Sequence, residues 1–136
     1  MSTPIVSLAY KSRSTDPVVD RRTLASILTT SQALNVANDL TGALACGDGY
    51  FVQVLEGPEA PLMETMARIH ADDRHHSLHV VGPTPIDQRQ FPDWCMASLV
   101  DEPALRPTIS LLCGDWETYG ARASKMLARV LNDEAD

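Results

Sequence analysis

The sequence predicts an α+β fold, in which strands and helices alternate along the chain and the strands form one β-sheet. Short apolar runs typical of buried strands alternate with two longer segments in which apolar residues recur at helical spacing. Between two of the apolar runs, Gly47-Asp48-Gly49 predicts a β-hairpin, because aspartate and glycine accept the positive φ angles of a tight turn. A chain of 136 residues with 44% hydrophobic residues is long enough to bury one core.

The predicted elements follow one another as strand, helix, strand, strand, helix, strand and strand. The first strand covers Ile5–Tyr10, and Asp20 is the predicted N-cap of a helix that ends between Asn35 and Asn38. The later elements are the hairpin strands Ala43–Cys46 and Tyr50–Leu55, a helix over Ala60–Ala71, and strands over Leu78–Val81 and Cys95–Val100. This order matches a ferredoxin-like βαββαββ sheet that carries one extra strand and has both helices on one face.

A further helix is predicted over Asp115–Asn132, where apolar residues form one stripe. The stripe consists of Trp116, Tyr119, Ala123, Met126, Leu127 and Val130. Since two helices on one face leave the other face of the sheet bare, we expect the C-terminal helix or helices, or a partner chain, to cover it. The predicted organisation is a domain over residues 1–100 and a helical extension over 101–136.

Composition excludes several classes of function. Eleven basic and eighteen acidic residues give a net charge of −7, which disfavours binding to nucleic acid. The apolar runs are too short to cross a membrane, and the N-terminus does not have the pattern of a secretory signal. Cys46, Cys95 and Cys113 form neither a disulfide framework nor a zinc motif, so we interpret them as buried thiols in a reducing cytoplasm.

Three polar side chains fall where the pattern predicts burial. Asn35 extends the apolar stripe of the first helix, Gln53 lies on the apolar face of its strand, and Tyr10 ends the first strand on its apolar face. Each costs about 1–3 kcal/mol if it is buried without a hydrogen-bond partner. Two amides and a phenol in one core suggest a planar ligand with donors and acceptors. The alternative, which the pattern alone slightly favours, is that they bond backbone groups or cap helix ends.

Other candidate sites are weaker. The histidines at 70, 75, 76 and 79 span a predicted helix end and strand start, which favours a solvated connection over a metal site, although Arg74 and His75 could hold an anion. Cys46 and Cys95 lie in predicted strands and in no nucleophile turn, so inert thiols are favoured over a catalytic one.

Six stretches of the chain occur together in a familiar order. They are Tyr10-Lys11-Ser12, Ser31-Gln32-Ala33-Leu34-Asn35, Leu40-Thr41-Gly42-Ala43-Leu44, Phe51-Val52-Gln53-Val54-Leu55-Glu56-Gly57, Asp72-Asp73-Arg74-His75 and Arg89-Gln90-Phe91-Pro92-Asp93-Trp94-Cys95-Met96. With these residues the chain resembles the BLUF domain, a blue-light sensor that uses FAD, from about Ile5 to Val100. The resemblance implies a ferredoxin-like sheet with two helices clasping the isoalloxazine ring.

The resemblance also implies roles for individual residues. Tyr10 matches the tyrosine that gives an electron and a proton to the excited flavin, and Gln53 matches the glutamine whose hydrogen bonding changes. Asn35 matches the asparagine that bonds the edge of the ring. Trp94 and Met96 match the pair that exchange or share the place near the glutamine and carry the signal to the fifth strand.

Three further pairs around the cofactor are implied. They are the small polar Ser12 and Ser31, the basic Arg74 and His75 near the ribityl and phosphate end, and Ile27 and Ile69 on either side of the ring. One departure concerns Leu34, since some relatives carry a polar or basic residue beside the asparagine. An apolar side chain there could alter hydrogen bonding in the dark or the recovery rate.

The predicted function is therefore a stand-alone blue-light photoreceptor that binds FAD and is not a turnover enzyme. The short stretch 101–136 suits one or two helices and no output domain, so we expect the signal to pass to a separate protein or to change self-association. The tail stripe supports a homo-oligomer and simple packing equally. The alternatives are a small ferredoxin-like enzyme (a hydrolase or a flavin reductase), which lacks a convincing nucleophile, and an interaction module without flavin.

Overall fold

The computed structural model describes residues 4–15, 21–47, 49–92, 97–100 and 105–135. Its sheet has the strand order β4-β1-β3-β2-β5, with β1 at Ile5–Ser14, β2 at Thr41–Gly47, β3 at Tyr50–Gly57, β4 at His75–Ile86 and β5 at Ala97–Val100. The first four strands pair antiparallel to their neighbours, and β5 pairs parallel to β2. The hairpin predicted around Gly47–Gly49 is the β2–β3 connection, in which Gly49 has a φ of 81°.

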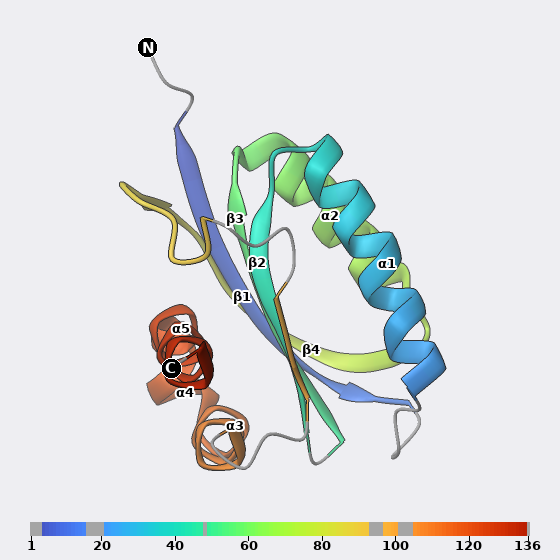
Figure 1. The fold of residues 1–136 in the computed structure, drawn as a ribbon, viewed down its shortest axis with the longest axis vertical. Helices are drawn as coiled ribbons and strands as arrows, with labels where there is room; N and C mark the ends of the chain where they lie inside the picture. Colours follow the sequence, from blue (N-terminus) through green and yellow to red (C-terminus); the bar gives the residue numbers. More distant parts are fainter. Residues whose placement is uncertain (1–3, 16–20, 48, 93–96, 101–104, 136) are drawn as a thin grey trace.

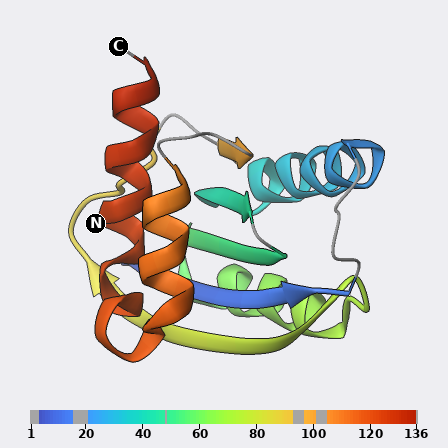
Figure 2. The same cartoon turned by 90° about the horizontal axis from the view of Figure 1, so that it is seen from below.

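Helices cover both faces of the sheet (Figures 1 and 2). One face carries α1, at Arg21–Ala37, and α2, at Glu59–Ala71. The other face carries α3 at Leu105–Gly114, α4 at Trp116–Tyr119, a 3₁₀ turn at Gly120–Arg122 and α5 at Ala123–Ala135. The predicted α+β, ferredoxin-like class is confirmed. The C-terminal helices cover the face of the sheet opposite α1 and α2, as expected.

The sheet separates two hydrophobic clusters because successive side chains of a strand point to opposite faces. The cluster under α1 and α2 includes Val6, Leu8, Tyr10, Phe51 and Leu55, together with side chains of both helices. Val52 and Val54 belong instead to the cluster under the C-terminal helices. The alternation that was predicted for β1 and β3 therefore holds.

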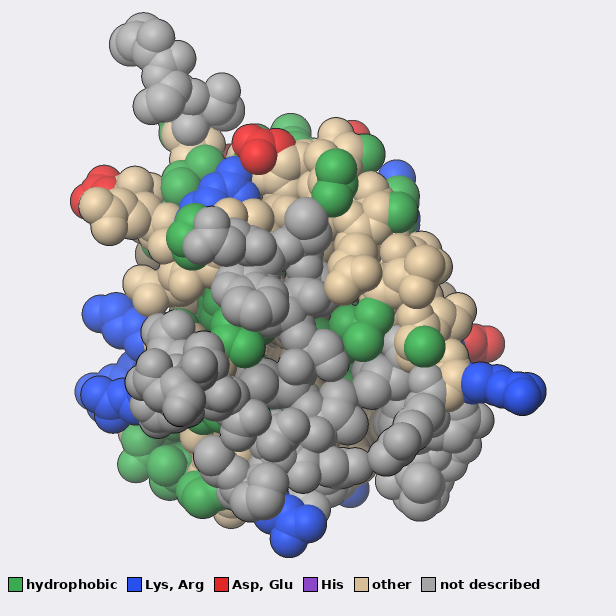
Figure 3. Space-filling model, in the orientation of Figure 1, with side chains coloured by type: hydrophobic (Ala, Val, Ile, Leu, Met, Phe, Trp, Pro, Cys, Tyr) green, Lys and Arg blue, Asp and Glu red, His purple; other side chains and the backbone are tan. Residues whose placement is uncertain are grey.

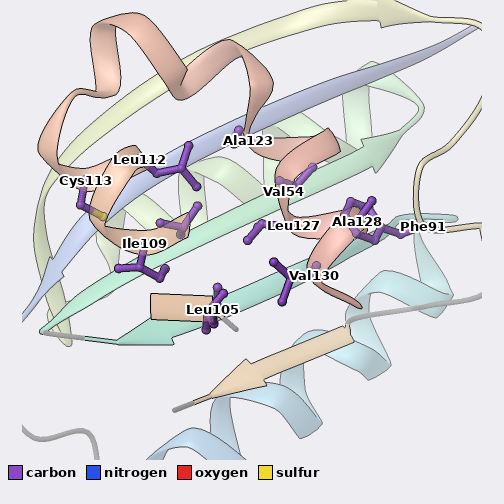
Figure 4. Packing of buried hydrophobic residues seen from close by; sticks show 14 of the residues in the cluster. Val54, Phe91, Leu105, Ile109, Leu112, Cys113, Ala123, Leu127, Ala128 and Val130 are labelled. Atoms are coloured by element: carbon purple, nitrogen blue, oxygen red, sulfur yellow. The ribbon is translucent and has the colours of Figure 1, made fainter. Parts of the chain in front are cut away.

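The second cluster explains why the C-terminal helices stay on the sheet. Figure 4 shows side chains of α3 and α5 gathered over Val54 of β3, with Leu112 from α3 and Leu127 from α5. Both leucines are fully buried. Burying a leucine side chain contributes about 1.5–3 kcal/mol, so these helices form a real part of the core.

The tail differs from the predicted single helix over Asp115–Asn132. The structure adds α3, which the sequence reading did not include, and interrupts the predicted helix at Gly120–Arg122. Pro107 falls in the first turn of α3, where a missing backbone N–H costs nothing. At Gly120 the chain passes so close to the Trp116 ring that a Cβ atom would lie 2.8 Å from a ring carbon.

Strand bounds differ as well. β4 begins at His75 and ends at Ile86, so it is much longer than the predicted Leu78–Val81. The predicted N-cap Asp20, together with Trp94, Cys95 and Met96, lies outside the described residues.

The described surface carries large exposed hydrophobic side chains on separate elements: Val36, Met63, Val80 and Leu111. Figure 3 shows hydrophobic side chains of one face in small groups, with Lys and Arg around the rim. In the ranges that the structure describes, no helix is long and apolar enough to cross a membrane.

Candidate functional site

Tyr10 and Gln53 form a buried pair in the middle of the sheet. They lie directly opposite each other on β1 and β3, so their side chains leave the sheet on the same face. The Tyr10 hydroxyl donates to Gln53 Oε1 at 2.5 Å, and both side chains are at most 5% exposed. Burial raises the pKa of Tyr10 well above its ordinary value, with smaller contributions from Cys46 and Asp72.

A cavity opens beside this pair, between α1, α2 and the sheet. The volume of the cavity is about 140 Å³, which is far more than one water molecule needs. Its lining consists of Tyr10, Ile27, Thr30, Ser31, Leu34, Asn35, Leu44, Phe51, Gln53, Thr65, Arg68, Ile69, Asp72, Arg74 and His75. Mostly apolar walls with a few convergent polar groups are typical of sites for small molecules and cofactors.

Asn35 supplies the second amide of the cavity. It lies near the C-terminal end of α1, is buried, and accepts the Leu40 backbone N–H at its own carbonyl at 2.8 Å. That contact fixes the connection from α1 to β2. With Gln53, Asn35 brings both N–H donors and carbonyl acceptors to an apolar slot between Ile27 and Ile69. This set of groups fits a flat, apolar ring system whose edge alternates donors and acceptors, as the isoalloxazine ring of FAD does.

His75 connects three elements at one end of the cavity. Its Nε2 contacts the Ile69 carbonyl of α2 at 2.6 Å, and its Nδ1 contacts Ser12 Oγ of β1 at 2.7 Å. Because a carbonyl oxygen only accepts, Nε2 donates to the Ile69 carbonyl, and Nδ1 shares a hydrogen bond with Ser12 Oγ. The ring also stands edge-on to Tyr10 and Phe51. Ser12 thus lies behind His75 and does not line the cavity.

Arg74 lines the cavity and forms an ion pair with Asp72. The Arg74 hydrogen bond is the main cause that holds the pKa of Asp72 below its ordinary value, and the same bond raises the pKa of Arg74. Arg68 of α2 also lines the cavity and adds a second cation. These two arginines are the groups suited to an anionic part of a ligand.

The structure brings most of the predicted site residues together. Ile27, Ser31 and Asn35 from α1 line the same cavity as Ile69, Arg74 and His75. The sequence analysis did not select the other lining residues, although helical spacing along α2 could have selected Thr65, which lies four residues before Ile69. Trp94 and Met96 lie outside the described residues, so the structure places neither.

The cysteines and histidines were the other candidate groups, and of these Cys95 lies outside the described residues. Cys46 and Cys113 are buried. Across the described part of the chain, no group of three or more His, Cys, Asp or Glu residues could hold a metal ion.

Comparisons with known proteins agree with this geometry. The family model described as BLUF, sensors of blue-light using FAD, matches residues 5–97. The photoactivated adenylate cyclase subunit beta of Euglena gracilis is 32% identical over 126 residues, which is 86% of this chain and 15% of that protein. The alpha subunit of the same organism is 36% identical over 87 residues, 64% of this chain and 8% of that protein. The chain therefore spans a small part of these curated relatives.

Solved structures share the fold. The dark-state structure of BlrB, a BLUF protein, has a TM-score of 0.74 and 29% identity, and the match covers 97% of this chain and 98% of that one. BlsA in its ground state has a TM-score of 0.71 and 28% identity, with 81% of this chain and 73% of that chain covered. The family model covers well over half of the sequence, and FAD is the cofactor named in its description. The chain belongs to the BLUF family of blue-light sensors that use FAD.

Proposed function

We propose that this protein is a blue-light photoreceptor whose switch is the Tyr10–Gln53 pair. The observation that carries the proposal is the buried hydrogen bond from the Tyr10 hydroxyl to Gln53 Oε1, at the wall of a cavity whose groups fit a flavin ring. The family is a sensor family, and its domain is not a catalytic one.

The chemistry follows from the two side chains. Bound FAD supplies an electron acceptor when blue light excites its ring. With that acceptor bound, Tyr10 would give up one electron and its phenolic proton and would take both back as the pair relaxes. Meanwhile Gln53 rotates or tautomerises, which exchanges the positions of its donor and its acceptor. The net change is a new hydrogen-bond arrangement with no atom gained or lost, which a two-state element of the fold can amplify.

The remaining cavity residues hold the ring in place for this step. Ile27 and Ile69 would pack against it, Asn35 would bond its edge, and Ser31 would add a small polar contact. Arg74 would hold the ribityl and phosphate end. His75 was expected to hold it as well, but both of its ring nitrogens bond protein groups, so it would line that end with its ring, and Ser12 would act through its hydrogen bond to His75.

We propose that the signal leaves through the segment that carries Trp94 and Met96, next to β5. It then reaches a separate effector protein or changes the self-association of the chain, with residues 1–100 as the sensor and 101–136 as the extension. The Euglena relatives are named as cyclase subunits, and the chain covers too little of them to carry that activity over. The reducing cytoplasm stays a prediction from the cysteine pattern.

The test is the visible absorption of the full chain loaded with FAD, before and after blue light. We expect bound flavin, a shift of its main band to the red, and recovery in the dark. A chain that neither carries flavin as purified nor binds added FAD would contradict the proposal, as would bound flavin whose spectrum is the same in light and dark.

A further inference from the structure

Glu56 is a fully buried carboxylate on the face of the sheet opposite the cavity. It lies on β3 three residues after Gln53, so its side chain enters the cluster under the C-terminal helices. Its Oε2 accepts the Gln90 backbone N–H at 2.7 Å, and its Oε1 accepts the Phe91 backbone N–H at 2.7 Å. Both oxygens of a β3 side chain therefore hold the backbone of a segment that lies 34 and 35 residues further along the chain.

Arg89 holds the same segment to β2 as well. Its Nη1 donates to Thr41 Oγ1 at 2.9 Å and to the Glu56 carbonyl at 3.2 Å, while Nη2 donates to the Asp39 carbonyl at 2.9 Å. Since Thr41 Oγ1 accepts from Arg89, its own hydrogen is left to donate to Glu56 Oε1 at 3.1 Å. Residues 89–91 are thus fixed to β3 directly and to the start of β2.

Residues 89–91, which Glu56 and Arg89 hold, connect to two other parts of the fold: the cluster under α5 and, further along the chain, strand β5. Phe91 is fully buried in the cluster that contains Leu127 and Ala128 of α5. Further along, Ala97 pairs with Ala43, where β5 lies beside β2. Phe91 is therefore tied to β3 through Glu56, and Ala97 is tied to β2 through its strand pairing.

Deepening the proposed function, on which this inference rests, we propose that Glu56 is the positioning residue that couples Gln53 to β5. A change in the bonding of Gln53 acts on β3, and Glu56 makes the backbone at Gln90 and Phe91 follow that strand. The start of the connection to β5 then moves with β3, and Phe91 carries the change to the cluster under α5. Glu56 touches neither the cavity lining nor Tyr10 in this scheme.

The chemistry of the contact requires a carboxylate. Burying a charged group is costly unless several donors satisfy it, and two backbone N–H groups and one hydroxyl do so here. An amide of the same shape has one oxygen, and its NH₂ group would face a backbone N–H. The Glu56→Gln substitution therefore keeps the volume of the side chain and removes at least one of the two backbone bonds.

The experiment compares amide hydrogen exchange of the FAD-loaded full chain in darkness and under blue light. In the unsubstituted protein we expect exchange at Ala97–Val100 to differ between the two conditions. In Glu56→Gln we expect the full red shift of the flavin, exchange at Gln90 or Phe91 about tenfold faster in the dark, and no light-induced difference at Ala97–Val100. Asp87→Asn, which removes an exposed carboxylate from the connection between β4 and β5, is the control and should keep the difference.

The outcomes separate this inference from the proposed function. A light-induced difference at β5 that persists in Glu56→Gln overturns the inference, because Glu56 is then only an anchor for the loop. A red shift with no response at β5 in the unsubstituted chain overturns it too. No red shift in the unsubstituted chain overturns the proposed function and the inference with it. If Glu56→Gln does not fold, Glu56→Asp, whose carboxylate is one methylene shorter and cannot reach both the Gln90 and the Phe91 backbone N–H, is judged by the same criteria.

Discussion

A Tyr10→Phe chain is expected to bind FAD and to lose the light-induced red shift completely. Phenylalanine keeps the ring that packs beside His75 and removes the hydroxyl that donates to Gln53. Without the phenol, the pair has neither its proton donor nor a readily oxidised group. The loss of a buried hydrogen bond should also lower the free energy of unfolding by about 1–3 kcal/mol. Absorption spectra in light and dark, with a denaturant titration, measure both effects.

Tyr50→Phe is the matched control for Tyr10→Phe. Tyr50 lies at the β2–β3 hairpin, where its hydroxyl accepts from Arg13 Nη1, and it does not line the cavity. Its loss should leave the red shift intact. A normal, reversible red shift in Tyr10→Phe would show that another group gives the electron and that the role assigned to Tyr10 is wrong.

Gln53→Leu is expected to give a yellow protein whose spectrum does not change in light. Leucine fills a similar volume but has neither a donor nor an acceptor, so no hydrogen-bond exchange is available beside the ring. The Tyr10 hydroxyl would also lose its partner while buried, at a cost of about 1–3 kcal/mol in the free energy of unfolding. Flavin content, light-minus-dark absorption and thermal unfolding check the three expectations.

The control for this change is Gln32→Leu, since Gln32 is an exposed glutamine on α1. It should bind FAD and shift as the unsubstituted chain does. If Gln53→Leu shifts to the red with undiminished amplitude, the rearrangement occurs elsewhere, and the Tyr10–Gln53 pair is only structural.

The core of the site was predictable because it follows from periodicity. Alternation along β1 and β3 puts Tyr10 and Gln53 on the apolar face, and helical spacing puts Asn35 in line with Ile27. Such patterns arise because a buried face selects its residue types at regular intervals. Resemblance to a known family then supplied the roles, which the pattern alone left open.

Other features of the site depend on contacts between distant segments, which leave no periodic signal. Ser12 reaches His75 across 63 positions of the chain, and Glu56 holds Phe91 across 35. A glutamate within an apolar strand gives no indication of which backbone groups will satisfy it. The α3 helix has a local obstacle to prediction. Pro107 is compatible with a helix only in the first turn, so its presence indicates a helix only when the first residue of that helix is already known.

The central claim is that light changes the hydrogen bonding of the Gln53 amide. The chain has four glutamines, and Gln32, Gln88 and Gln90 are exposed, so their replacement by alanine leaves Gln53 as the only one. In that variant, loaded with FAD and with ¹³C in the glutamine side-chain carbonyl, a light-minus-dark infrared spectrum reports on Gln53 alone. We predict a pair of isotope-sensitive carbonyl bands that appears with the red shift and decays with it in the dark. A full red shift without any isotope-sensitive band would contradict the account.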